Sequence, residues 1–181
     1  MAEYQYKGMA IVVPDNDREH QGYFEAARER RLVVQRCSDC GKLRWEPGTA
    51  CPWCTSLTWE WHQVSGKGTI YSYQIVTHPI QPGFNDWVPY PVVLVELDEQ
   101  RGEPTEDEAL RIVANLLDDQ NEPEKEENVA IGKRVEVVFV DASEDFTIPQ
   151  FRLLDEAPGA PLWQFKATEH TIRPHNPPLG R

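Results

Sequence analysis

The 181-residue sequence has no apolar stretch near the ~20 residues that a membrane-spanning helix needs, so we expect no membrane segment. The stretch Met1–Val13 holds one lysine and no long apolar run, which argues against a signal peptide. We therefore place the protein in the cytoplasm. In that compartment, four regularly spaced cysteines are more often metal ligands than disulfide partners.

Positive charge is also scarce, because 18 Lys and Arg residues stand against 30 Asp and Glu, a formal net charge of -12. Affinity for nucleic-acid backbones comes from neutralising phosphates with Lys and Arg, so this deficit argues against general nucleic-acid binding. The stretch Asp98–Asn128 holds twelve acidic and three basic side chains, and therefore carries -9 of the total. The body of the chain is close to neutral and leaves room for a local basic pocket.

Familiar catalytic motifs are missing. The sequence contains neither a Gly-x-Ser-x-Gly nucleophile elbow nor a His-Glu-x-x-His helix. Once the four cysteines are assigned to a metal, no free thiol remains as a nucleophile. We therefore expect a chain that performs no chemistry of its own.

The cysteines form two Cys-x2-Cys pairs, Cys37/Cys40 and Cys51/Cys54, with ten residues between the pairs. Two intervening residues let a tight turn aim both sulfurs at one point, and two such turns supply the tetrahedral thiolates that zinc prefers. Gly41 follows the first pair, where a positive φ is often needed. The pattern predicts one structural zinc ion without an open coordination position. The alternatives are reduced thiols, a redox pair, or iron on the same ligands.

Hydrophobic periodicity predicts a mainly β chain with one N-terminal helix. Tyr23 and Phe24 recur at helical spacing within Glu19–Arg30, for which Asp17 is the expected N-cap, and Met1–Asp17 looks irregular. Alternating residues predict two short ribbon strands and then five strands that suit a closed antiparallel OB-type barrel, with a split half-sandwich as the alternative. The five are Gly68–His78, Tyr90–Leu97, Leu110–Leu117, Arg134–Val140 and Thr147–Leu154.

These elements divide the chain into four parts. We assign 1–31 to an N-terminal segment and helix, 32–64 to a zinc ribbon, 65–154 to an OB-fold and 155–181 to a C-terminal tail. Within the tail, Leu162, Trp163 and Phe165 are expected to pack either on the body or on a partner.

The motifs, in this order and spacing, resemble the acyl-CoA-associated zinc-ribbon/OB-fold proteins, a family long described only as a domain of unknown function. The similarity covers roughly Gln21–Leu154. The matching stretches are Tyr23–Ala26, Leu32–Cys37, Cys40–Gly41, Cys51–Cys54, Ser65–Tyr73, Tyr90–Leu97 and Ile131–Val135.

The resemblance implies a rubredoxin-like zinc ribbon before the barrel. It also implies a non-catalytic accessory subunit that binds acyl-CoA and supports a thiolase-fold partner within a hetero-oligomer. Family members act on CoA thioesters in thiolysis, in retro-aldol cleavage of sterol side chains, and in acyl transfer. The long acidic stretch Asp98–Glu127 and the tail after Leu154 depart from the family pattern, so the acyl group and the direction of reaction stay open.

Candidate CoA contacts follow from this implied role. The loop Ile80–Pro91 is stiffened by prolines and carries Phe84, Trp87 and Tyr90, which either line a pantetheine channel or cap the barrel as core. His78, before this loop, is either a base or hydrogen-bond donor to a thioester or a plain strand-end residue, and we favour the second interpretation. CoA phosphates also need cations, and the candidates include Arg44 and Lys67.

Two rival functions remain open. One is a single-stranded nucleic-acid-binding OB module that stacks bases on Tyr71, Tyr73, Phe84 and Trp87. The other is a free-standing acyl-CoA hydrolase that uses His78 as its base. The negative charge disfavours the first, and the missing nucleophile disfavours the second.

Overall fold

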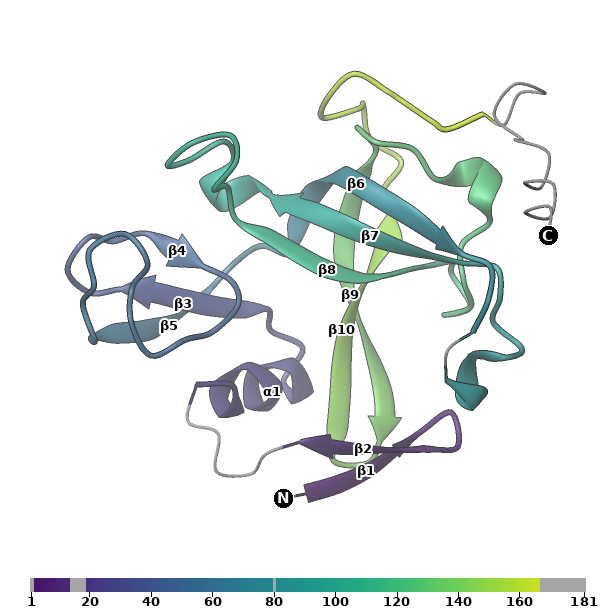
Figure 1. The fold of residues 1–181 in the computed structure, drawn as a ribbon, viewed down its shortest axis with the longest axis horizontal. Coiled ribbons are helices and arrows are strands. Elements are labelled where there is room, and N and C mark those ends of the chain that lie inside the picture. Colours follow the sequence, from purple (N-terminus) through teal and green to yellow (C-terminus); the bar gives the residue numbers. More distant parts are fainter. Residues whose placement is uncertain (1, 14–18, 80, 167–181) are drawn as a thin grey trace, which may run out of the picture.

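The computed structural model describes residues 2–13, 19–79 and 81–166, which form three β-sheets and one α-helix (Figure 1). The mainly β class predicted from the sequence is confirmed. Within the described residues, no helix has the length and apolar character needed to cross a bilayer. In chain order the elements are β1 (Ala2–Tyr6), β2 (Met9–Val13), α1 (Gln21–Arg28), β3 (Val33–Cys37), β4 (Leu43–Arg44), β5 (Trp59–Gln63), β6 (Lys67–Val76), η1 (Pro82–Phe84), β7 (Tyr90–Leu97), η2 (Asp98–Gln100), β8 (Arg111–Leu117), η3 (Glu126–Asn128), β9 (Arg134–Ser143) and β10 (Phe146–Leu153).

Five strands close into a barrel in the order β10-β8-β7-β6-β9, and β9 pairs back to β10. Four of the five pairings are antiparallel, whereas β10 and β8 run parallel with Phe151 opposite Leu116. The prediction of an entirely antiparallel barrel is therefore wrong for this pair. Strands in a closed ring of odd number cannot alternate direction all the way round, so one pair must be parallel. The closed five-stranded arrangement is that of an OB-fold.

Alternation along β7 decides which side chains fill the barrel. Val93 and Val95 are fully buried, while Leu94 between them lies on the outer face. Val113 of β8 pairs with Leu94, shares that outer face and is 61% exposed. Each fully buried Val, Leu or Phe side chain stabilises the fold by roughly 1.5–3 kcal/mol, so the inner rows of the strands provide most of the barrel's stability.

The N-terminal segment is a β-hairpin, so the prediction that Met1–Asp17 is irregular was wrong. β1 and β2 pair antiparallel, with Tyr6 opposite Met9, around a two-residue turn. The turn residues Lys7 and Gly8 have φ angles of 50° and 72°, the positive values that a type I′ hairpin turn requires. The predicted cap Asp17 lies outside the described residues, and α1 begins after His20.

Helix α1 packs against both the ribbon and the barrel (Figure 1). Tyr23 is buried with its ring 4.5 Å from the ring of Trp45 in the ribbon, and Phe24 lies 5.1 Å from Phe146 of β10. The helix thus uses adjacent apolar residues to hold two otherwise separate sheets. The helix predicted from the sequence, Glu19–Arg30, is longer than the observed helix by two residues at each end.

A glutamine provides a second link between ribbon and barrel. Gln100, at the end of η2, donates from Nε2 to the Leu43 carbonyl and accepts from the Leu43 amide at Oε1, both at 2.7 Å. Both residues are buried, so the amide side chain takes the place of a neighbouring strand for Leu43. We refer to this pair of bonds as the Gln100 latch.

Candidate functional site

The four cysteine sulfurs lie together at the end of the ribbon sheet. All four are within 4.8 Å of one another, with Cys37 3.5 Å from Cys54 and Cys40 3.6 Å from Cys51. Zinc bound tetrahedrally at Zn–S distances of ~2.3 Å requires sulfurs about 3.8 Å apart. The donor set and its spacing therefore fit one zinc ion.

The two cysteine turns are built in the same way. The amide of Gly41 donates to the Cys37 carbonyl at 3.0 Å, and the amide of Thr55 donates to the Cys51 carbonyl at 2.9 Å. Gly41 and Thr55 have φ angles of 74° and 62°, so each turn ends on a left-handed residue. The glycine was expected from the sequence, but Thr55 in the same conformation was not, because threonine rarely adopts a positive φ.

Backbone amides favour thiolates at this site. Amide hydrogen bonds from Cys40 and then Asp39 lower the pKa of Cys37 to about 6, against the opposing effect of burial. Burial raises the pKa of Cys51, but hydrogen bonds from the amides of Cys54 and Trp53 outweigh it, so the pKa lies below its ordinary value. Thiolates this close repel one another, and a divalent cation removes that repulsion.

The site is closed because four protein ligands complete a tetrahedral zinc ion. Cys37 and Cys51 are buried, whereas Cys40 and Cys54 are exposed, so the centre lies near the surface. A zinc ion held by these four residues has no position for water or substrate, and its role is to hold the two turns together. The ribbon strands bury Val33, Val34 and Leu43 in the core, so the metal's contribution to folding falls mainly on the two cysteine turns.

The predicted cation Arg44 lies inside the ribbon and is only 4% exposed. Its Nε donates to Gln35 Oε1 at 2.7 Å, and its Nη2 donates to the Gly48 carbonyl at 2.6 Å. Arg44 therefore holds the loop between β4 and the second cysteine pair against β3. Lys67, the other predicted cation, pairs with Glu156 at 2.8 Å on a different part of the molecule, so the two do not converge.

The three loop aromatics form one cluster. The Phe84 ring lies 5.7 Å from Trp87 and 5.5 Å from Tyr90. Trp87 is 7% exposed, because the ammonium of Lys7 lies 3.5 Å from the centre of its ring. The N-terminal hairpin therefore covers the loop, and Trp87 packs as core beneath it. His78 is exposed in the loop that follows β6.

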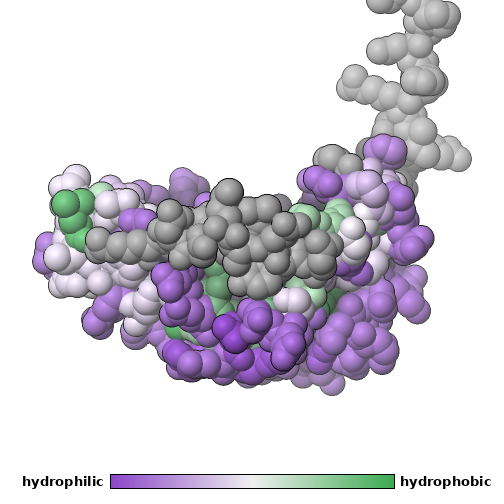
Figure 2. Space-filling model, turned by 90° about the horizontal axis from the view of Figure 1, so that it is seen from below, coloured by the Kyte–Doolittle hydropathy of each residue, from purple (hydrophilic) through white to green (hydrophobic). Residues whose placement is uncertain are grey.

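A shallow groove of about 370 Å³ runs between α1, the η1 loop and the outer faces of β7, β8 and β10. None of the described residues that line it is charged. They are Tyr23, Phe24, Phe84, Tyr90, Val92, Val113, Ala114, Asn115, Ile148, Pro149 and Gln150. The view from the hairpin and α1 side shows hydrophobic surface in the hollows of a mainly hydrophilic face (Figure 2). The sequence indicated this groove only through the apolar residue Val113. Its outward position became clear only once its strand partners were known.

Comparisons with known proteins agree with this geometry. Residues 24–60 match the family model of the ChsH2 rubredoxin-like zinc ribbon domain, and residues 61–140 match that of the ChsH2 C-terminal OB-fold domain. A DUF35 domain-containing scaffold protein of Methanocaldococcus jannaschii is 33% identical over 115 residues, which are 63% of this chain and 71% of that protein.

Two further similarities involve named enzyme assemblies. A probable enoyl-CoA hydratase alpha subunit of Thermomonospora curvata is 40% identical over 139 residues, 77% of this chain but only 39% of that protein. A chain of the solved Ltp2-ChsH2(DUF35) aldolase matches with a TM-score of 0.63 and 37% identity, and the match covers 78% of this chain and 98% of that chain.

The fold and the four-cysteine centre define a zinc-ribbon/OB-fold protein. The chain belongs to the DUF35 family, and the resemblance seen in its motifs is confirmed. The predicted zinc cofactor is confirmed with it.

Proposed function

We propose that this chain is a non-catalytic accessory subunit that binds acyl-CoA and supports a thiolase-fold partner in carbon–carbon bond cleavage or formation. The observation that carries the proposal is the match to the Ltp2-ChsH2(DUF35) aldolase, in which 98% of a solved chain is covered at 37% identity. An aldolase makes or breaks a carbon–carbon bond. The name of the Thermomonospora relative adds a CoA thioester as the kind of substrate.

The metal centre supports an accessory role. Four cysteines leave a zinc ion without an open position, so the metal cannot activate water or polarise a thioester carbonyl. His78 is exposed on its loop, where solvent surrounds the imidazole. The chain's own residues then bind, orient and exclude water, and the partner supplies the groups that react.

The uncharged groove is the best candidate for the apolar part of the acyl group. Phe84 and Tyr90 line it, whereas Trp87 is buried behind them. Phe84 and Tyr90 are therefore the predicted CoA contacts that we retain, whereas Arg44 stabilises the ribbon and Trp87 packs beneath the N-terminal hairpin. His78 is exposed and Lys67 pairs with Glu156, and neither lines the groove.

The rival nucleic-acid function finds little support in the barrel. OB-folds bind oligonucleotides on the face formed by their second and third strands, here β7 and β8. The middle of that outer face is aliphatic, with Val92, Leu94 and Val113, and its basic residue Arg111 is paired with Glu96. Of the expected stacking residues, Tyr71 lies under the guanidinium of Arg111, 3.5 Å from its ring centre, and Trp87 is buried.

Co-purification from the natural host tests the proposal against its rivals. The proposal expects a thiolase-fold chain in stoichiometric amount, and acyl-CoA that binds the pair more tightly than either chain. Single-stranded nucleic acid bound at ~150 mM salt would favour the OB-module rival. A chain that purifies alone and hydrolyses acyl-CoA would favour the hydrolase.

A further inference from the structure

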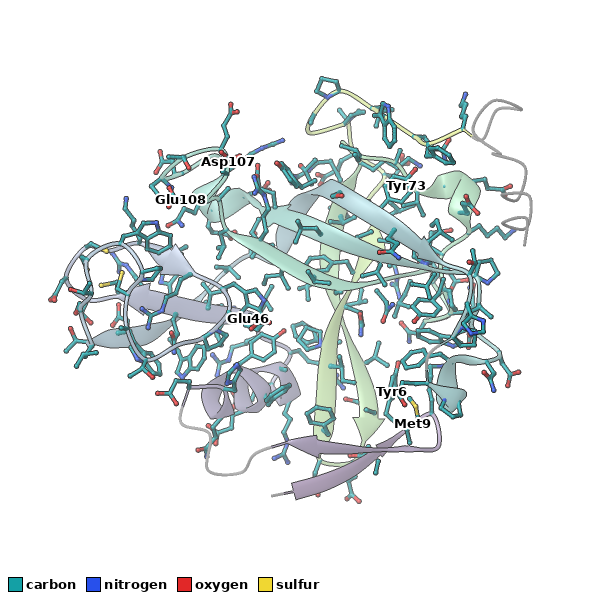
Figure 3. All side chains as sticks on the ribbon, viewed as in Figure 1. Tyr6, Met9, Glu46, Tyr73, Asp107 and Glu108 are labelled. Atoms are coloured by element: carbon teal, nitrogen blue, oxygen red, sulfur yellow. The ribbon has the colours of Figure 1, made fainter. Side chains whose placement is uncertain are left out.

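The last described residues of the tail are fixed to the barrel by their polar groups. The Ile131 amide donates to the Trp163 carbonyl at 2.8 Å, and the Trp163 amide donates to the Ile131 carbonyl at 3.1 Å. The Phe165 amide donates to the hydroxyl of Tyr73 at 2.8 Å. The tail therefore crosses the barrel next to Tyr73 as an ordered, extended segment (Figure 3).

Gln164 fixes the direction of the neighbouring side chains. Its Nε2 lies 2.9–3.2 Å from the carbonyls of Glu126, Glu127 and Val129, so this side chain points into the barrel surface at η3. Side chains alternate along an extended segment, so those on either side of Gln164 point away from that surface.

Trp163 and Phe165 remain exposed as a result, and Leu162 is exposed beside Lys133 and Arg134. Leu162 and Trp163 are each 56% exposed and Phe165 is 52% exposed, and we call these three residues the tail patch. The ring of Tyr73, 6.5 Å away, supports one edge of Trp163. From the sequence we predicted that these residues pack on the body or on a partner. In the structure the backbone of this segment is hydrogen-bonded to the barrel, but the three side chains are exposed.

This combination is typical of binding anchors. Tryptophan is enriched among the few residues that dominate binding energy at protein interfaces. The backbone hydrogen bonds hold the patch in one conformation before binding, so little further ordering is required. The tail patch also lies outside residues 24–140, the stretch matched by the two family models, so neither the ribbon nor the barrel accounts for it.

The acidic side chains of η3 beside the patch favour one kind of complementary surface. Glu126 and Glu127, whose carbonyls hold Gln164, are exposed and form no ion pair with another described residue. They belong to the acidic stretch Asp98–Asn128, which carries -9. A complementary surface has an apolar pocket bordered by Lys and Arg, which would speed association at low salt.

We infer that the tail patch docks in an apolar, basic-rimmed pocket on the thiolase-fold partner and helps select that partner. The inference rests on the proposed function for the identity of the partner. Trp163 and Phe165 fill the pocket, Leu162 adds apolar contact at its edge, and Glu126 and Glu127 face its rim.

The test uses the 181-residue chain and a thiolase-fold chain recovered with it from the natural host, with the dissociation constant measured by calorimetry. Trp163→Ala and Phe165→Ala should each raise the dissociation constant about 10- to 100-fold. Leu57→Ala is the control, because Leu57 is 65% exposed but lies on the ribbon. Thermal unfolding of every variant should match the wild type, since the deleted side chains are exposed. Glu126→Gln with Glu127→Gln should mainly slow association and reduce its salt dependence.

Each failure has a separate signature. If the wild-type pair binds and Trp163→Ala binds equally well, the tail patch is not the anchor, while the proposed function stands. If the wild-type chains do not associate, the proposed function fails and the inference fails with it. If the isolated chain forms a dimer that Trp163→Ala abolishes, or deleting residues 167–181 exposes a shielded Trp163 ring to solvent, then the chain covers its own patch and the inference is overturned.

Discussion

The Gln100 latch makes a sharp prediction about how the ribbon is held to the barrel. In Gln100→Ala, the Leu43 amide and carbonyl both lose their 2.7 Å partner while remaining in a buried position. A buried backbone group left without a partner costs about 1–3 kcal/mol. Because Gln100 is 8% exposed, water can partly replace the side chain. We therefore expect a loss of roughly 2–4 kcal/mol in the free energy of unfolding.

Urea denaturation measures that loss, and hydrogen exchange of the Leu43 amide shows whether the ribbon has come loose. Gln74→Ala is the matched control, since Gln74 is an exposed glutamine on β6. Zinc content should not change, because all four cysteine ligands lie within the ribbon. A Leu43 amide that stays as protected as in the wild type, together with unchanged stability, would refute the latch.

Three further predictions concern the metal, the buried tryptophan and an ion pair. Elemental analysis should find one zinc per chain, and Cys40→Ser should release it while barrel amides stay protected from exchange; a metal-free chain with an ordered ribbon would contradict this. Trp87→Ala should lower the free energy of unfolding by about 3–5 kcal/mol, seen as a lower Tm, because this ring is core beneath the Lys7 hairpin turn; an unchanged Tm would show that it is not. The hydrogen-bonded guanidinium of Arg134 holds the pKa of Asp98 below its ordinary value of 3.8, so the pair stabilises the fold above that pH and the contribution is lost as pH falls. Asp98→Asn should flatten this acid loss in urea curves taken across pH, and an unaltered pH dependence would exclude the pair as its source.

Local patterns were enough to predict most of the barrel. The apolar, valine-rich run in Tyr90–Leu97 predicted β7 with its observed bounds. The parallel β10–β8 pair was missed because alternation within one strand carries no information about the direction of its neighbour. The β1–β2 hairpin was missed because its turn is Lys7-Gly8, in which a lysine holds a positive φ.

The candidate site was predictable where its geometry is local. Cysteine spacing placed the four sulfurs together because each pair lies on one turn, and the two turns share one small sheet. Burial of Trp87 could not be predicted, because the residue that covers it, Lys7, is distant in the sequence. The uncharged groove likewise combines a helix, a loop and three strands, so only the assembled fold shows it.

Steady-state turnover of an acyl-CoA substrate by the thiolase-fold chain, with and without this protein, tests the central claim most directly. We expect no turnover by this protein alone, and activity or stability of the partner mainly when the two are mixed. His78→Ala should leave the activity of the pair nearly unchanged, whereas Phe84→Ala should weaken acyl-CoA use by ~1–3 kcal/mol if the groove holds the acyl group. Turnover by the isolated protein that His78→Ala abolishes would contradict the account and establish a hydrolase in its place.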